Sequence, residues 1–112
     1  MKPKRDQRVL IADIRSSIAS ILSRTRGIDL AAFEADETIW KATLYDLQVM
    51  GEAAKRLPDE MSASNPEIPW REMIAMRDFL AHGYYRVELK RLWALIEREL
   101  GEVDAKLAAL DG

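Results

Sequence analysis

The C-terminal stretch of the chain reads ELKRLWALIERELGEVDAKLAAL over residues 88–110. Its apolar residues recur at alternating spacings of four and three, at Leu89, Trp93, Ile96, Leu100, Val103, Leu107 and Leu110. This spacing places them on one stripe of an α-helix. Leu92 and Leu95 widen the stripe, so the helix is expected to face two partners at once. A coiled coil has the same heptad-like run, and the other segments of the chain decide between the two.

Three further segments have apolar residues at helical spacing, and they cover residues 6–24, 36–57 and 69–82. Asp6 and Asp36 stand where the first two helices begin, as N-caps do. Gly27 follows the first helix, Pro58 stops the second, and Gly83 is expected just past the end of the third. Four amphipathic helices need a common core, which favours a bundle over a coiled coil.

The predicted fold is therefore an all-α antiparallel bundle of four main helices plus short helical turns. The turns are expected at residues 29–35 and within the connection 58–69. The chain of 112 residues suits one domain, residues 1–112, with a core of about 6–110. Only five Gly and four Pro are present, which weighs against a loop-rich all-β fold. Trp40, Trp70 and Trp93 lie on apolar stripes, as core or dimer-interface residues do, and base-stacking platforms are the lesser alternative.

Composition excludes several classes of protein. No apolar run approaches the roughly 18 residues of a membrane span, so no membrane contact is expected and a cytoplasmic location is compatible. The chain has no cysteine, hence no disulfide and no thiolate metal site; neither a metal nor another cofactor is expected. The net charge is −2, yet residues 1–26 hold seven Lys and Arg against two Asp. Contact with a nucleic acid is therefore expected through a local patch.

The single histidine lies in the stretch RDFLAHGYY, residues 77–85. Arg77 offers a planar charged group that matches phosphate oxygens, and His82 exchanges protons near neutral pH. The two are about 140° apart around a helix, so His82 is expected at the helix end, with Tyr84 folded back toward the same cleft. Spacing alone favours ordinary structural roles for these residues. His82 is more often a helix cap or a surface residue, and Arg77 is more often solvated or ion-paired. The tyrosines are more often amphipathic residues at the rim of the fold.

RNA cleavage through the adjacent 2′-hydroxyl works best with both a general base and a general acid. One chain supplies one imidazole. A two-fold dimer that brings two motifs to one cleft supplies two imidazoles and two arginines. If the protein is a nuclease, its composition favours a dimeric active site.

The wider sequence resembles the HepT-like branch of the HEPN ribonucleases over roughly residues 8–100. The resemblance is carried by the Arg77, His82 and Tyr84 spacing together with three stretches: MGEAAKRLP at 50–58, PEIPW at 66–70 and LAHGYY at 80–85. It implies a homodimeric helical bundle and metal-independent endoribonuclease activity on RNA, such as a tRNA or an mRNA. It also implies the toxin role in a type VII toxin–antitoxin system, neutralised when a minimal nucleotidyltransferase antitoxin adenylylates the motif tyrosine.

Carried over by the resemblance, Arg77 stabilises the phosphate and His82 is the acid–base group. Tyr84 is then the auxiliary residue and the adenylylation target, although Tyr85 is a second hydroxyl beside it. Asp78 stands where the family often has asparagine and is expected to orient Arg77 or His82.

Basic residues near the motif and at the N-terminus are candidates for RNA binding: Arg86, Lys90, Arg91, Arg5 and Arg8. A solvated helix face explains any one of them equally well. The alternative function is a non-catalytic helical module that docks a nucleotidyltransferase, which has no need of Arg77, His82 and Tyr84 together.

Overall fold

A computed structural model describes residues 6–110 of the chain, and every regular element within this range is helical. The four main helices are α1 (Gln7–Thr25), α3 (Glu37–Arg56), α5 (Trp70–Gly83) and a C-terminal helix made of α6 (Leu89–Leu95), η2 (Ile96–Leu100) and α7 (Gly101–Leu110). The short elements are α2 (Leu30–Ala35), α4 (Asp59–Ser64) and η1 (Tyr84–Arg86). The predicted all-α bundle is confirmed. No helix in this part of the chain is long and apolar enough to cross a bilayer.

The predicted helix ends are set by local chemistry. The Asp6 carboxylate accepts a hydrogen bond from the backbone N–H of Arg8 at 2.8 Å, and the Asp36 carboxylate accepts one from Ile39 at 3.1 Å. Each bond satisfies a backbone donor that the first turn of a helix leaves open. Gly27, with φ of 79°, turns the chain after α1. These three predictions, made from residue type and position, are confirmed.

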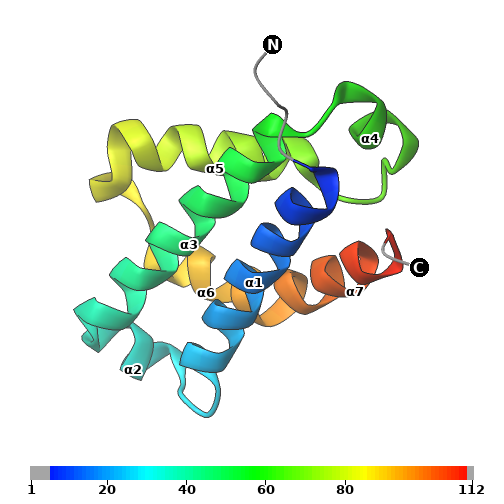
Figure 1. Cartoon of the computed structure of the whole chain (residues 1–112). Coiled ribbons are helices and arrows are strands. Elements are labelled where there is room, and N and C mark those ends of the chain that lie inside the picture. The colour runs from blue at the N-terminus through cyan, green and yellow to red at the C-terminus, as the bar shows by residue number, and fades with distance from the viewer. Residues whose placement is uncertain (1–5, 111–112) are drawn as a thin grey trace.

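Helix α3 lies between α1 and α5 and packs extensively on both. Figure 1 shows α1 and α3 running in opposite directions side by side, with α5 crossing the C-terminal part of α3. The C-terminal helix packs on α1, and α2 contacts α6. Phe33 anchors α2, because its fully buried ring lies 5.1 Å from that of Trp93. Trp70 and Trp93 are core residues as predicted, whereas Trp40 is only half buried.

The C-terminal helix is continuous but changes its winding. Residues Ile96–Leu100 form a π-helical turn between the two α-helical parts. Ile96 and Leu100 are nevertheless buried, so the apolar stripe predicted for this helix still faces the core. The sequence spacing did not reveal the turn, because the stripe has the same spacing with or without it.

The closest approach in the bundle lies where α3 crosses α5, at Gly51. A Cβ atom at Gly51 would lie 2.2 Å from the Cβ of Arg77 and 2.6 Å from the carbonyl oxygen of Met73. Only a residue without a side chain fits there. The crossing therefore fixes the root of the Arg77 side chain against the backbone of α3.

Candidate active site

Two carboxylates hold the guanidinium of Arg77. Its Nη2 lies 3.1 Å from an oxygen of Glu52 on α3, and its Nη1 donates a hydrogen bond of 3.0 Å to Asp78. The hydrogen bond to Asp78 is the main cause that raises the pKa of Arg77, and the attraction of Glu52 adds to it. A guanidinium has more N–H donors than these two contacts use. Arg77 is therefore a fixed cation with donors left for an incoming phosphate.

Arg77 lines a pocket of about 400 Å³ between α1, α3 and α5. The polar side chains around it include Gln48, Glu52 and Arg56. Glu52 bridges the two arginines, because its second carboxylate oxygen lies 3.4 Å from Nε of Arg56. The pocket is thus lined by two arginines and two carboxylates, Glu52 and Asp13, and the arginine N–H donors that Glu52 and Asp78 leave unused can bind the oxygens of a phosphate.

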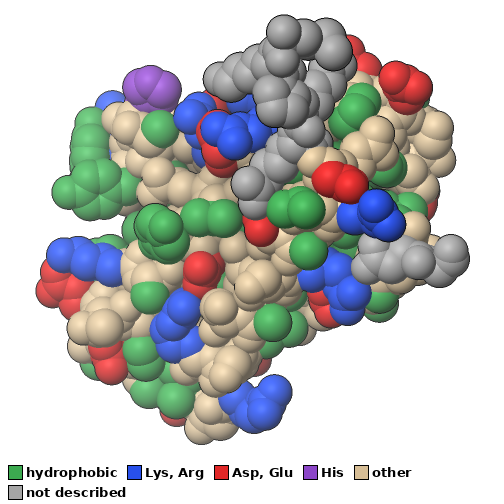
Figure 2. All heavy atoms as spheres, in the orientation of Figure 1, with side chains coloured by type: hydrophobic (Ala, Val, Ile, Leu, Met, Phe, Trp, Pro, Cys, Tyr) green, Lys and Arg blue, Asp and Glu red, His purple; other side chains and the backbone are tan. Residues whose placement is uncertain are grey.

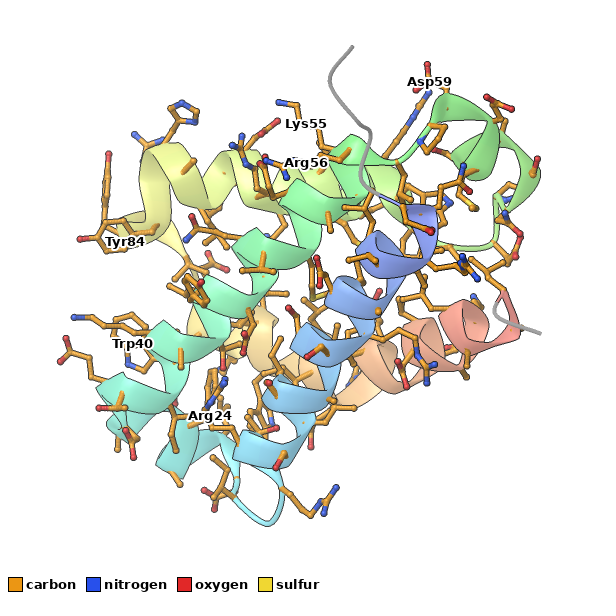
Figure 3. All side chains as sticks on the ribbon, viewed as in Figure 1. Arg24, Trp40, Lys55, Arg56, Asp59 and Tyr84 are labelled. Carbon is orange, nitrogen blue, oxygen red and sulfur yellow. The ribbon has the colours of Figure 1, made fainter. Side chains whose placement is uncertain are left out.

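Arg56 and Glu52 were not predicted as site residues. Both lie in the stretch 50–58 that the sequence comparison with the family singled out, which was the available signal. Figure 3 shows Lys55 and Arg56 at the C-terminal end of α3. Within residues 6–110, no group of three or more His, Cys, Asp and Glu side chains is placed to hold a metal ion.

His82 is anchored to the helix through one ring nitrogen. Its Nδ1 lies 2.9 Å from the backbone carbonyl oxygen of Asp78, one turn earlier in α5. A carbonyl oxygen only accepts, so Nδ1 is the donor in this hydrogen bond, and in the neutral ring Nε2 carries the lone pair. The imidazole is exposed and is visible as the purple side chain in Figure 2. Nε2 is therefore suited to take a proton from a substrate bound at the surface.

Tyr84 and Tyr85 project from the turn η1 that follows α5. They are 57% and 73% exposed, and Arg86 lies over the ring of Tyr85 at 5.7 Å. On α3, the hydrogen bond to Glu37 is the main cause that raises the pKa of Lys41, and the attraction of Tyr84 is a minor one. In Figure 3, Tyr84 and Trp40 lie on the same side of the molecule, away from Arg56.

Arg77 and His82 are connected through Asp78, whereas the ring contact of Tyr84 is with Tyr85. The Asp78 side chain accepts from Arg77, and its backbone carbonyl accepts from His82. Neither His82 nor Tyr84 lines the Arg77 pocket. Gly83, predicted to lie just past the helix end, is instead the last residue of α5, and its φ is −156°. The chain continues into η1 without the left-handed reversal that would fold Tyr84 back.

The predicted RNA-binding residues lie on other surfaces. Arg86 and Arg91 line a separate groove of about 630 Å³ between α5 and α6, and Arg91 is paired with Glu88 at 2.8 Å. Lys90 is exposed on α6. Arg8 is paired with its neighbour Asp6, and Arg5 lies outside the described residues. None of the four described candidates lines the pocket of Arg77.

Comparison with known proteins places this chain in a class of ribonucleases. The model of the family described as "Ribonuclease HepT-like" matches residues 14–110, most of the chain. The chain therefore belongs to this family of HEPN ribonucleases.

Two relatives cover nearly the whole chain. A protein of Thermococcus cleftensis named "Probable ribonuclease HepT" is 35% identical over 107 residues, which span 96% of this chain and 97% of the relative. A protein of Methanocaldococcus jannaschii named "Putative RNase MJ0125" is 34% identical over 101 residues, or 90% and 87% of the two chains. No solved structure gave a significant match.

Proposed function

We propose that this chain is the toxin of a type VII toxin–antitoxin pair, a cytoplasmic, metal-independent endoribonuclease whose active site is completed by a second copy of the chain. The observation that carries the proposal is the connected set Arg77, Asp78 and His82 at the end of α5. It combines a fixed cation with an exposed imidazole that has a free ring nitrogen. Membership of the ribonuclease family supplies the class of substrate, RNA, and a tRNA or an mRNA is the proposed target.

The chemistry follows from these groups. Nε2 of one His82 takes the proton of the RNA 2′-hydroxyl, and the freed oxygen attacks the adjacent phosphorus. The bond from phosphorus to the 5′ oxygen breaks, and that oxygen takes a proton from a second imidazole. The products are a 2′,3′-cyclic phosphate and a 5′-hydroxyl. Arg77 binds the phosphate oxygens, on which negative charge builds up in the transition state.

The second imidazole is the reason for the proposed homodimer, because each chain has one histidine. Phe79 supports this arrangement: it is 41% exposed, and it lies one turn before His82 on the same side of α5. It also lines the largely apolar groove beside α6. Arg86, Lys90 and Arg91 are proposed to bind RNA phosphates away from the point of cleavage.

Mixed dimers test the composite site. A dimer of one wild-type and one His82→Ala chain, isolated through two different affinity tags, is expected to keep less than about one tenth of the wild-type cleavage rate. The reason is that a shared cleft then holds only one imidazole. Independent sites would keep half of the rate, and a protein that is monomeric by analytical ultracentrifugation would also contradict the composite site. A wild-type dimer that carries both tags is the control.

The RNase is proposed to be regulated by adenylylation of Tyr84. In this reaction the Tyr84 hydroxyl oxygen attacks the α-phosphorus of ATP, pyrophosphate leaves, and a minimal nucleotidyltransferase antitoxin catalyses the transfer. Tyr84 is 57% exposed and is therefore accessible to an enzyme. The added nucleotide competes for the surface that RNA must reach.

Mass spectrometry after incubation with the cognate nucleotidyltransferase and ATP tests this step. The wild type and the Tyr85→Phe variant are expected to gain AMP and to lose RNase activity together. The Tyr84→Phe variant is expected to gain none. Modification of the Tyr84→Phe variant but not of the Tyr85→Phe variant would identify Tyr85 as the target. If the chain binds the nucleotidyltransferase but has no RNase activity of its own, the alternative function as a docking module is favoured.

A further inference from the structure

We infer that Glu52 is a positioning residue of the active site, which holds the Arg77 guanidinium in its pocket for the RNA phosphate. The inference rests on the proposed ribonuclease function and names a residue to which the cleavage chemistry above gives no part. Its basis is the ion pair between Glu52 and Arg77, at 3.1 Å, inside the pocket that both side chains line.

The two ends of the Arg77 side chain are fixed by consecutive residues of α3. Gly51 meets the root of the side chain, since any Cβ at this position would overlap the Cβ of Arg77. Glu52 meets the charged end through Nη2. A long, flexible side chain held at both ends loses little further freedom when it binds a phosphate, which is what a preorganised site requires.

Asp78 cannot replace Glu52 in this role. Asp78 follows Arg77 on α5 and moves with it, whereas Glu52 belongs to the helix that forms the opposite wall of the pocket. Contact with Glu52 therefore orients Arg77 relative to the pocket. The other carboxylate oxygen of Glu52 lies 3.4 Å from Nε of Arg56, so the same carboxylate also pairs with the second arginine of the pocket.

Removal of the Glu52 carboxylate is expected to have two opposite effects on the kinetics. Together they distinguish a positioning role from a purely electrostatic one. Loss of the orienting contact slows the chemical step. Loss of a negative charge beside the phosphate favours RNA binding. A positioning role therefore lowers kcat while KM stays equal or falls, whereas a repulsive carboxylate alone would lower KM and leave kcat unchanged. A merely structural role would instead lower the melting temperature.

The full-length chain with a fluorescent single-stranded RNA is used to test the inference. Glu52→Ala is expected to lower kcat at least about tenfold, with KM no higher than that of the wild type. Glu52→Gln is expected to recover most of kcat, because its amide oxygen still accepts from Arg77. The matched control is Glu60→Ala, which removes an exposed carboxylate from α4 and is expected to match the wild type.

Two kinetic results would overturn the inference. The first is a Glu52→Ala kcat equal to that of Glu60→Ala. The second is a Glu52→Gln variant as slow as Glu52→Ala, which would mark Glu52 as a proton acceptor, since an amide cannot take a proton.

A readout without RNA separates this inference from the proposed function. The Nε–Hε signal of Arg77 in ¹⁵N NMR spectra, assigned by its loss in Arg77→Ala, is expected to shift in Glu52→Ala and to stay in place in Glu60→Ala. An unchanged signal would refute the positioning contact even if RNA is cleaved. A shifted signal in a protein that cleaves no RNA would leave the contact intact and refute the ribonuclease.

Discussion

Replacement of Gly51 by alanine is expected to lower the free energy of unfolding by about 2 kcal/mol, within the range for an overpacked core. The added methyl would lie 2.6 Å from the backbone carbonyl oxygen of Met73, which no side-chain rotation can relieve. Helices α3 and α5 must then separate, against the gain of about 1 kcal/mol that alanine brings to a helix. Urea denaturation followed by circular dichroism measures the change.

The matched control is Gly101→Ala in α7. This glycine is also helical, and nothing lies within 4 Å of a Cβ built there. Alanine is therefore expected to raise stability by about 0.5–1 kcal/mol. Equal stability of the two variants would show that the helices do not cross as closely as described. Because the crossing also fixes Arg77, Gly51→Ala is expected to cleave RNA more slowly even where it is fully folded.

Replacement of His82 by alanine is expected to lower kcat/KM for RNA cleavage by about 10³-fold, the size of a lost acid–base group. The same change should alter stability by no more than about 0.5 kcal/mol, since the ring is exposed. The ring is held by the hydrogen bond from Nδ1 to the Asp78 carbonyl oxygen. Cleavage assays and urea denaturation on the same preparation measure the two quantities.

Arg71→Ala is a suitable control for His82→Ala, because Arg71 is an exposed residue at the other end of α5. It is expected to cleave RNA like the wild type. If His82→Ala retains wild-type cleavage, the acid–base role belongs to another residue. If it fails to fold, the anchoring of His82 to Asp78 is structural.

The fold was predictable because its determinants are local in sequence. Apolar spacing marked the four long helices, and Asp6, Asp36 and Gly27 marked their ends through contacts a few residues away. The π-helical turn at Ile96–Leu100 was not predictable, since it changes the winding of the helix without moving the buried residues to another face.

The site was predictable only in part. The bond of His82 to the Asp78 carbonyl oxygen follows from their spacing of one helical turn, whereas adjacent helical side chains point apart, so the bond between Arg77 and Asp78 does not follow from spacing. Glu52 and Arg56 reach Arg77 through the crossing of two helices, and no local pattern specifies which residues meet there. The path of the chain after α5 depends on the backbone of Gly83, whose residue type allows both a left-handed reversal and the observed continuation into η1.

The single, exposed imidazole of each chain has a consequence for dosage. If two chains must meet to make one cleft, then below the dissociation constant of the pair the number of working clefts grows with the square of copy number. A cell that holds few copies then carries almost no cleavage capacity, and a modest rise in synthesis brings a steep rise in RNA decay. The open face around His82 would act as a threshold on expression before any antitoxin is involved.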